Sequence, residues 1–569
     1  MKRDREDEEL GMESKPPRQR TKKTETQQFG SATKQPPVLL LRGTPLERSC
    51  LGVGARWARS SLRRLLFDEM RPSSLSGIPK QAYSLLRNHL SSLPPSHPVL
   101  PSPSTLSSTL SSLPDPQSSS YLSPLGPSAT FSYLLSSIVP SLNLQSLSPN
   151  YYGFVTGSVL PIAEAADNIV TALDQNVQVH FPLSESSQWV HSASTYIEST
   201  ALGMLLSLLD LSPDEWKGRT FTTGATASNI IGLACGREHV LPGSAKLGLL
   251  QAASDVKVRE VQILTSMGHS SLGKAASIVG LGRDAVKDVG RENEPWRLDL
   301  DAVERELQRE GVRSIIVVSA GEVNTGRFAT GVFDMPKLRS LADRFGAWIH
   351  VDGAFGIFAR TLPKSEEFLA LHASVAGLEL ADSIGADGHK LLNVPYDNGI
   401  FITRHPTTLS EVFQNANAAY LSSTTGPDGI LSPLNIGLEN SRRFRALPVY
   451  AVLLSEGSEG MSAMFSRMVH LSRKIAAFVR DSPHYEWLPD QESSIENVFM
   501  IVMFRARDKK LNEVLVDKIN GSGKMFVGGT QWQGQKAVRL AVSTWRVDVE
   551  RDAALVAEVL NAIAEGISS

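Results

Sequence analysis

Short runs rich in β-branched residues alternate with helical stretches through the middle of the chain, and this alternation limits the possible folds more than any other feature. Strands separated by helices of about 10–15 residues indicate βαβ units, so the pattern predicts an α/β fold with a mostly parallel sheet. Ligands of such sheets bind at the carboxyl ends of the strands, and the polar residues that end these runs are therefore candidates for a site. The runs are VQILTS (261–266), RSIIVVSA (313–320), AWIHVD (347–352), DSIGAD (382–387) and GIFITR (399–404).

The length of the chain and a change of pattern near residue 440 predict two domains. A chain of 569 residues exceeds what one core usually holds. We expect a large domain over 150–440 and a small C-terminal α+β domain over 441–569. The small domain is expected to contain a long helix with one break (443–480), two further helices (510–520 and 548–566) and strands at 498–506 and 538–545.

The first 149 residues lack the pattern of a self-contained core. Residues 1–70 are mostly polar, charged or Arg/Ser-rich, and we expect a disordered extension there. An over-extended reading frame, with translation beginning at Met70, would also explain this stretch. Residues 71–149 are crowded with Ser, Pro and Leu, with short helical pieces at 82–90 and 131–139. This region is predicted to be an arm that packs on something else.

Composition excludes several classes of function. The net charge of −2 provides no field that would gather nucleic acid or anionic lipid, and no apolar run is long enough to span a bilayer. The two cysteines, Cys50 and Cys235, are too few for a disulfide framework or a zinc site, so no metal is expected. A reducing, cytoplasmic location follows. The alternative is import into an organelle, because residues 42–66 have the composition of a transit peptide.

The first candidate site residue is the lysine of DSIGADGHKLLNVPYDNG (382–399). A strand is predicted to end near Asp387, which places His389 and Lys390 just beyond it. A lysine in such a position can lose its proton and form a Schiff base with an aldehyde. The alternative is a surface lysine on a loop.

The second candidate is Asp352, which ends the apolar strand of AWIHVDGAFGIFA (347–359). A buried carboxylate is costly unless it meets a positive partner, and a protonated pyridine nitrogen would be one. The alternative is an aspartate that caps the next turn. One helix and one strand separate Asp352 from Lys390, so both side chains can point into one crevice.

Two weaker patterns also follow predicted strands. The turn in GRTFTTGATASNIIGLACGREH (218–239) leads into an apolar helix whose N-terminus favours an anion. It is neither a P-loop nor a dinucleotide fingerprint, and an ordinary Thr/Ser cap is the alternative. His269 in ILTSMGHSSLGKAASIVGLG (263–282) could lie flat on an aromatic ring, although a lone histidine is more often structural. Together these residues predict a site for a phosphorylated aromatic aldehyde.

From SPNYYGFVTG (148–157) to its C-terminus, the chain resembles the group II pyridoxal-phosphate-dependent amino-acid decarboxylases, which include the aromatic amino-acid, glutamate and tyrosine decarboxylases. The resemblance is carried by HVDGAFGIFA (350–359), DGHKLLNVPYDNG (387–399), HSSLGKAA (269–276) and SRRFRALPVYA (441–451). It implies the aspartate-aminotransferase-like fold (fold type I), pyridoxal 5′-phosphate as cofactor, and a homodimer with active sites at the interface. The arm at 71–149 would then clasp the partner.

The resemblance also implies roles for individual residues around the cofactor ring. Lys390 would hold the cofactor as a Schiff base, and His389 belongs to the same motif. Asp352 would pair with the pyridine nitrogen, and Ala354 would pack against one face of the ring. His269 would stack on the other face and help to protonate the carbanion.

Further roles concern the phosphate and the substrate. Ala225 and Thr226 match the phosphate-binding positions, and Asp387 sits where many relatives have Asn or Asp near the phosphate. Arg539 matches an arginine that holds a substrate carboxylate in glutamate decarboxylase-like members; a β-strand arginine facing solvent is the equal alternative.

Two departures from the family pattern bear on the reaction. Glu322 stands where many relatives have a threonine near the ring oxygen. The stretch 426–440 lacks the tyrosine that donates a proton in aromatic amino-acid decarboxylases, and Tyr420 lies upstream. The sequence therefore predicts decarboxylation of an L-amino acid to carbon dioxide and an amine. The alternatives are a carbon–carbon lyase, an oxidative aldehyde synthase, and a non-catalytic binding protein that keeps the fold.

Overall fold

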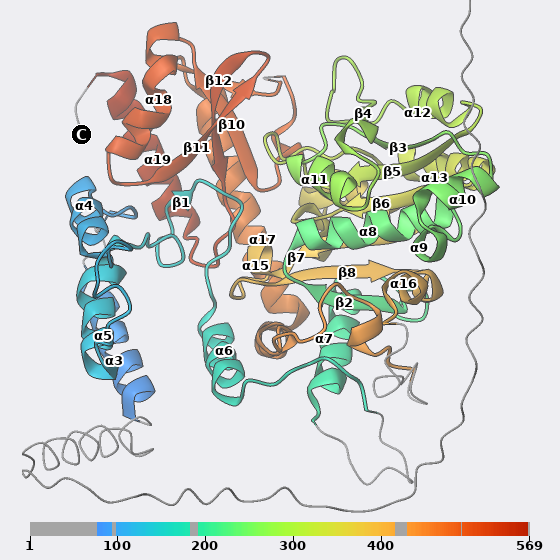
Figure 1. Cartoon of the computed structure of the whole chain (residues 1–569). Coiled ribbons are helices and arrows are strands. Elements are labelled where there is room, and N and C mark those ends of the chain that lie inside the picture. The colour runs from blue at the N-terminus through green and yellow to red at the C-terminus, as the bar shows by residue number, and fades with distance from the viewer. Residues whose placement is uncertain (1–76, 94–97, 182–191, 416–428, 491, 567–569) are drawn as a thin grey trace, which may run out of the picture. The chain divides into compact units, whose positions relative to one another are not determined.

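The computed structural model describes residues 77–93, 98–181, 192–415, 429–490 and 492–566. Residues 81–569 form one compact unit, which is built on two sheets (Figure 1). The extension expected over 1–70 and the upstream Tyr420 both lie outside the described residues.

The larger sheet has seven strands and is mostly parallel, as the sequence predicted. Only β8 breaks the pattern, because it pairs antiparallel with both of its neighbours. The five predicted runs all form strands in this sheet. In spatial order the strands are β2 (Gly218–Thr222), β8 (Gly399–Thr403), β7 (Ser383–Asp387), β6 (Trp348–Asp352), β5 (Val312–Ser319), β3 (Glu260–Thr265) and β4 (Val286–Asp288).

Helices cover both faces of this sheet, and Figure 1 shows α8 lying across the front of it. The α-helices of this part of the chain are α6 (Pro161–Leu173), α7 (Ser194–Leu208), α8 (Ala225–Val240), α9 (Ser244–Leu247), α10 (Leu249–Asp255), α11 (Ser270–Ile278), α12 (Leu300–Leu307), α13 (Asp334–Phe345), α14 (Leu369–Val375), α15 (Gly388–Leu391) and α16 (Pro406–Phe413). Short helices lie at η3 (Arg283–Ala285), η4 (Gly356–Thr361), η5 (Glu366–Phe368), η6 (Leu378–Leu380) and η8 (Pro433–Asn435).

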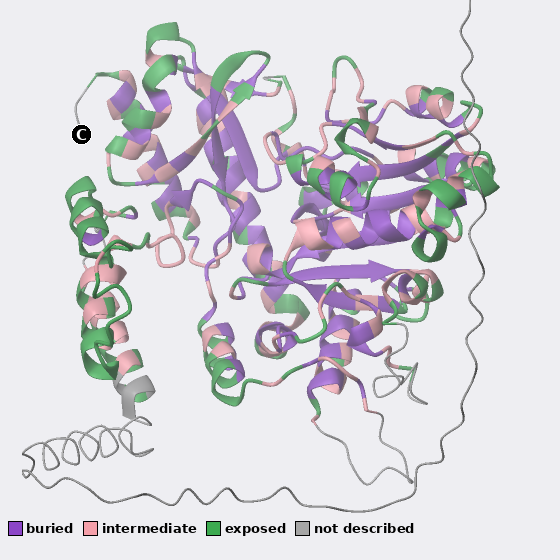
Figure 2. Cartoon of the chain, in the orientation of Figure 1, coloured by how far each residue is buried: buried purple, intermediate pink, exposed green. Residues whose placement is uncertain are grey.

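The alternation of side chains along β6 divides the core into two clusters. Trp348 packs in a cluster with Ile231 of α8, whereas Ile349 and Val351 pack in a cluster that contains Leu338 of α13. Successive side chains of a strand point to opposite faces, and a strand of a parallel sheet is buried on both. The strands of this sheet are accordingly buried along most of their length (Figure 2).

The second sheet has five strands, in the order β1 (Tyr151–Tyr152), β11 (Phe526–Trp532), β12 (Gln535–Ala541), β10 (Ile501–Ala506) and β9 (Tyr485–Leu488). Its helices are α17 (Ala446–Asp481), α18 (Lys509–Gly521), α19 (Val549–Ala564) and the short η9 (Ile495–Asn497). The long helix α17 is broken at Gly457, where φ is 58°. Strand β1 pairs in parallel with β11, so the chain enters this sheet near residue 150 and returns to it at the end.

The arm consists of short helices whose side chains are largely exposed (Figure 2). They are α3 (Gly77–Ser92), α4 (Pro103–Ser112), α5 (Pro127–Tyr133), the π-helix η1 (Leu134–Ile138) and η2 (Val139–Ser141). None of their side chains belongs to the described hydrophobic clusters.

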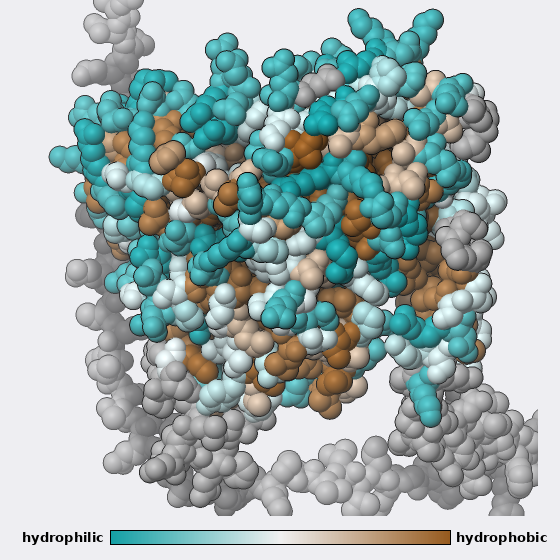
Figure 3. Space-filling view, turned by 180° about the vertical axis from the view of Figure 1, so that it is seen from behind, coloured by the Kyte–Doolittle hydropathy of each residue, from teal (hydrophilic) through white to brown (hydrophobic). Residues whose placement is uncertain are grey.

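The surface is mixed in character. Seen from behind, hydrophilic residues dominate the upper part, whereas hydrophobic residues reach the surface in the lower part (Figure 3). Within the described ranges, no helix combines the length and the apolar character needed to cross a membrane.

Gly157 supports the segment that carries Lys390, and we predict that Gly157→Ala destabilises the fold. The Gly157 N–H donates to the His389 carbonyl at 3.2 Å, and an added Cβ would lie 2.1 Å from the Lys390 carbonyl oxygen. Forcing the two segments apart should lower the free energy of unfolding by about 1–3 kcal/mol. Thermal unfolding followed by circular dichroism measures this change.

Gly203 provides the matched control, because it lies inside α7 and an added Cβ would meet nothing within 4 Å. Gly203→Ala should leave the unfolding temperature unchanged or raise it. Equal unfolding temperatures for the two variants would contradict the assigned contact.

Candidate active site

A cavity of about 370 Å³ lies where β5, β6 and β7 end and α8 begins. Because parallel strands end at the same edge of a sheet, their terminal residues Ser319, Asp352 and Asp387 all reach this cavity. The structure brings together every candidate residue except Arg539. The lining includes Lys390, His389, Asp387, Asp352, Ala354, His269, Ala225, Thr226 and Glu322.

Lys390 lies in the short helix α15, directly after β7. Its Nζ is 2.9 Å from Oδ2 of Asp387 and 5.9 Å from the centroid of the Phe355 ring. Asp387 is buried, and its other oxygen accepts the backbone N–H of Ala225 at 2.5 Å. One carboxylate thus orients the lysine amine and also contacts the first turn of α8. Lys390 is therefore a lining residue of an enclosed site and not a surface lysine on a loop.

The N-terminus of α8 is suited to an anion. Gly224 precedes the helix and provides no side-chain cap, so the Thr/Ser cap considered from the sequence is absent there. A Cβ on Gly224 would lie 3.4 Å from both Asp387 and His389, which shows how closely the turn approaches them. Ala225 and Thr226, in the first turn of this 16-residue helix, line the cavity, and a phosphate placed there would gain from the helix dipole.

Asp352 is held by a hydrogen bond that sequence reasoning missed. The side-chain amide of Asn229, on α8, donates to Oδ2 of Asp352 at 2.9 Å. The other oxygen of Asp352 accepts the Ala354 N–H at 3.3 Å, so the predicted turn cap is also present. A carboxylate fixed in this way can face the pyridine nitrogen of the cofactor, which is the positive partner that the sequence predicted.

Behind Asn229 the hydrogen bonds continue through β6 and β7. Nε2 of His350 lies 3.0 Å from Oδ1 of Asn229, and Nδ1 lies 2.8 Å from Oγ of Ser383. The same hydroxyl oxygen accepts the indole N–H of Trp348 at 3.0 Å. An indole N–H can only donate and an ionised carboxylate can only accept. When His350 is neutral, every hydrogen bond in this chain points from Trp348 toward Asp352.

The direction of the chain requires a neutral His350, and burial supplies that condition. His350 is fully buried, and desolvation lowers the pKa of its imidazole to about 4, although the charge of Asp352 opposes the shift. Its proton then sits on Nε2 and donates to Asn229. The signal for both missed residues lies in spacing: Asn229 is one helical turn after Ala225, and His350 is two strand residues before Asp352.

The two other histidines at the cavity have different environments. His269 precedes α11, and its Nδ1 accepts the Ser271 N–H at 3.2 Å, which leaves Nε2 to carry the proton. His389 lies with Nδ1 2.7 Å from the Asn398 carbonyl oxygen. Burial lowers the pKa of His389 in spite of the nearby Asp387. Both rings reach the cavity.

Glu322 and Arg539 differ from what their positions suggested. The Glu322 carboxylate accepts the backbone N–H and side-chain donors of Asn324 and Thr325, so it stabilises its own turn while lining the cavity. Arg539, on β12, is 9% exposed and donates to the carbonyls of Val323 and Gly153. The solvent-facing alternative for Arg539 is therefore wrong. Arg539 does not line the described cavity, and its contact with substrate stays a prediction.

Comparison with known proteins agrees with this geometry. The pyridoxal-dependent decarboxylase conserved domain matches residues 187–507. L-2,4-diaminobutyrate decarboxylase of Acinetobacter baumannii is 27% identical over 365 residues, which are 60% of this chain and 67% of that protein. Phenylacetaldehyde synthase of Arabidopsis thaliana is 23% identical over 369 residues, which are 62% of this chain and 71% of that protein.

Among solved structures, that of Oryza sativa TDC with PLP and tryptamine superposes with a TM-score of 0.71 at 22% identity, covering 88% of this chain and 99% of that one. The match confirms the predicted fold, a mostly parallel sheet with a smaller C-terminal sheet. A lysine, a fixed carboxylate and a helix N-terminus around one cavity are the groups that pyridoxal phosphate requires, so the described residues fit this cofactor.

We predict that Asn229→Leu weakens cofactor binding by about tenfold or more. The substitution keeps the branched shape of the side chain but leaves Oδ2 of Asp352 without a donor and the His350 N–H without an acceptor, and each unsatisfied buried group costs about 1–3 kcal/mol. Titration of the cofactor-free protein with pyridoxal phosphate, followed by absorbance, measures the dissociation constant.

Asn168 is the matched control, because it lies on α6 away from this cavity. Asn168→Leu should leave the dissociation constant unchanged. If Asn229→Leu lowers the unfolding temperature but binds the cofactor as tightly as the unaltered protein, Asn229 does not position Asp352.

Proposed function

The chain belongs to the pyridoxal-dependent decarboxylase family, and from that premise we propose that it removes carbon dioxide from an L-amino acid and releases an amine. One observation carries the proposal: a single cavity collects the Lys390 amine, the Asp352 carboxylate and the N-terminus of α8. These are the three attachment points for the aldehyde, the ring nitrogen and the phosphate of pyridoxal 5′-phosphate.

Each residue has a task that follows from its surroundings. When bound, pyridoxal phosphate supplies an aldehyde for an amine and an electron sink for the electrons left by departing carbon dioxide. Lys390 would hold the aldehyde and exchange it with the substrate amine. Asp352, fixed by Asn229, would keep a proton on the ring nitrogen. Ala225 and Thr226 would hold the phosphate, and Ala354 would support one face of the ring.

The residues that return a proton to the substrate carbon differ in this chain from those of aromatic amino-acid decarboxylases. Stretch 426–440 contains no tyrosine. We propose that Nε2 of His269 donates this proton to the substrate carbon. Nδ1 of the same ring is engaged by Ser271, and the ring lies at the cavity. The substrate carboxylate would be held by Arg539 only if its bonds to Val323 and Gly153 open.

The second candidate function is oxidative formation of an aldehyde, and the missing tyrosine favours it. If the substrate carbon is not protonated promptly, one molecule each of oxygen and water would react there instead and give an aldehyde, ammonia and hydrogen peroxide with the carbon dioxide. The similarity to phenylacetaldehyde synthase supports keeping this candidate. A binding protein without activity is the third, and the presence of Lys390, Asp352 and His269 argues against it.

We predict that Lys390→Ala removes both the visible absorbance of bound cofactor and all product formation, because no other lysine of the described residues lines this cavity. Lys274→Ala is the control, since this exposed lysine lies on α11 outside the cavity. The unaltered protein is given a panel of L-amino acids, and mass spectrometry identifies the products.

An amine without peroxide supports decarboxylation, and an aldehyde with ammonia and peroxide supports the second candidate. A visible spectrum that Lys390→Ala leaves unchanged would refute the assignment of Lys390.

We further propose a cytoplasmic homodimer in which the arm clasps the partner. The arm carries exposed leucines, of which Leu122 is 89% exposed, and hydrophobic residues also reach the surface in the lower part of Figure 3. Exposed apolar side chains that gather on one part of a surface often mark an interface. Light scattering of the full chain should give twice the mass of 61.8 kDa; a monomeric mass would contradict the proposal.

A further inference from the structure

A second cavity of about 420 Å³ shares no lining residue with the first. Its walls come from the loop between β5 and α13, from α14, and from the segment 493–497. The loop is the same one that carries Glu322 at the first cavity, and it contributes Arg327, Phe328 and Thr330 here.

Arg327 is a buried cation without a carboxylate partner. Its side chain is 7% exposed, its Nη2 donates to Oγ of Ser493 at 2.9 Å, and its guanidinium lies 5.7 Å from the Trp487 ring centroid. Burial lowers the pKa of Arg327 to about 10, so the group stays charged at neutral pH. No ion pair to it is formed within the described part of the chain. A buried charge is costly when no opposite charge meets it.

Two of the carboxylates near Arg327 are already paired with other arginines. Asp334 and Glu294 both form ion pairs with Arg297 and with Arg291. Asp490 and Glu294 act on Arg327 only through space. These two carboxylates are thus paired with two other guanidinium groups, and neither forms an ion pair with Arg327 beside the cavity.

Further polar groups at the cavity lack partners. Oγ1 of Thr330 and Nε of Arg297 are both buried without a hydrogen-bond partner. Phe328 and Trp296 provide apolar wall, and Phe333 stands at the rim with 85% of its surface exposed. The cavity is therefore lined by a buried cation without an ion-pair partner, by spare donors and by apolar walls, together with the carboxylates of Glu294 and Asp334, which are paired with other arginines.

We propose that this cavity binds a small organic anion, with its carboxylate or phosphate on Arg327 and its apolar part against Phe328 and Phe333. A guanidinium donates to two oxygens of such a group in one plane, and the hydroxyl of Thr330 provides a further donor. The volume of the cavity exceeds that of the anionic group alone, and this leaves room for a short apolar portion. This proposal does not rest on the proposed activity, because none of the residues of the second cavity lines the first.

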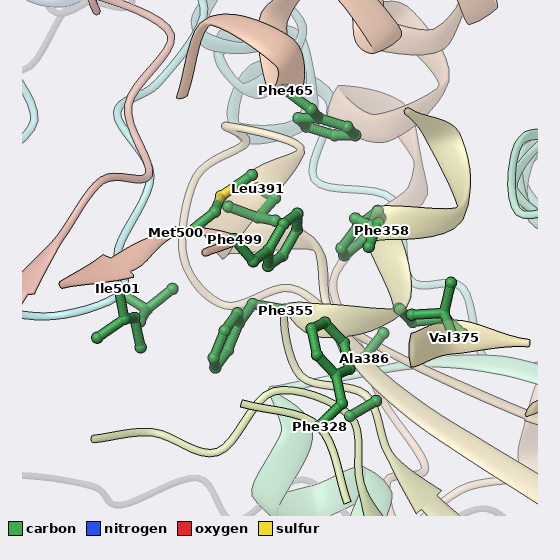
Figure 4. Packing of buried hydrophobic residues seen from close by; sticks show 14 of the residues in the cluster. Phe328, Phe355, Phe358, Val375, Ala386, Leu391, Phe465, Phe499, Met500 and Ile501 are labelled. Carbon is green, nitrogen blue, oxygen red and sulfur yellow. The ribbon is translucent and has the colours of Figure 1, made fainter. Parts of the chain in front are cut away.

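The position of Arg327 couples this ligand to the first cavity. The Glu322 N–H donates to the Arg327 carbonyl at 2.6 Å, so the two residues close one turn. Phe328 and Phe355 both pack on Phe499, with centroid distances of 6.0 and 6.4 Å (Figure 4). Phe355 lines the first cavity. A ligand that shifts Arg327 or Phe328 would therefore also shift Glu322 or Phe355 at the first cavity.

The test is calorimetric titration of the full chain with its cofactor bound. The probes are phenylacetate and phenyl phosphate, which carry the two anionic groups, and phenylacetamide, which is a neutral analogue of the first. We expect one saturable site per chain for at least one anion, and binding of the amide about tenfold weaker or worse. The anion that binds more tightly identifies the carboxylate or the phosphate as the preferred group.

Arg327→Met should weaken anion binding by about tenfold or more, because it keeps the stem and removes the charge. Arg344→Met is the matched control: its guanidinium also lies over a ring, that of Phe345, but its side chain is 64% exposed. Thr330→Val removes one donor with little change in volume, so it tests the site even if Arg327→Met does not fold.

The proposal is refuted by the absence of saturable binding up to about 10 mM, or by binding that both Arg327→Met and Thr330→Val leave unchanged. A change of assembly mass in Arg327→Met would also refute it, since the charge would then meet a carboxylate of a second copy of the chain.

Discussion

The register of three parallel strands is the constraint on which the rest of the structure depends. Ser319 of β5 lies opposite Asp352 of β6, and Asp352 lies opposite Gly385 of β7. Because these strands run in the same direction, their ends deliver side chains to one edge of the sheet. A shift of β6 by one residue would turn Asp352 to the other face and bury Val351 against α8 instead. The same shift would break the hydrogen bonds that His350 and Asp352 make with Asn229, so buried contacts behind the site help to fix its chemistry.

Helix α8 links the two ends of the expected cofactor through one rigid element. In its first turn the Ala225 N–H donates to Asp387, and one turn later Asn229 holds Asp352. The distance between the phosphate position and the carboxylate is therefore set by the rise of a helix and not by loops. The buried chain from Trp348 extends this rigidity into the sheet. Each polar group in the chain has a partner, which is the condition under which a buried network stabilises a unique arrangement.

Local pattern was sufficient for the strands and for the main site residues, and insufficient wherever distant segments meet. The β-branched runs predicted β3 and β5 to β8 within about one residue, because burial on both faces leaves short, nearly continuous apolar runs. The placement of Lys390 and Asp352 followed from the same runs. Asn229 was missed because its partner is decided by how α8 crosses β6. Arg539 was misjudged as possibly solvent-facing, since only the folded chain shows that β12 is covered by segments near Gly153 and Val323.

Strand β1 links the beginning of the folded region to its end, and this has a consequence for synthesis on the ribosome. Tyr151 and Tyr152 pair with Phe526 and Val527, and Gly157, a few residues further along, contacts the backbone of Lys390. The lysine segment can therefore reach its final support only after nearly the whole chain has emerged, because contacts between such distant segments form late. A chain cut short before β11 would lose a sheet partner for β1 along with its last helix. A nascent chain should consequently acquire its site in one late step, even though the seven strands of the larger sheet are made much earlier.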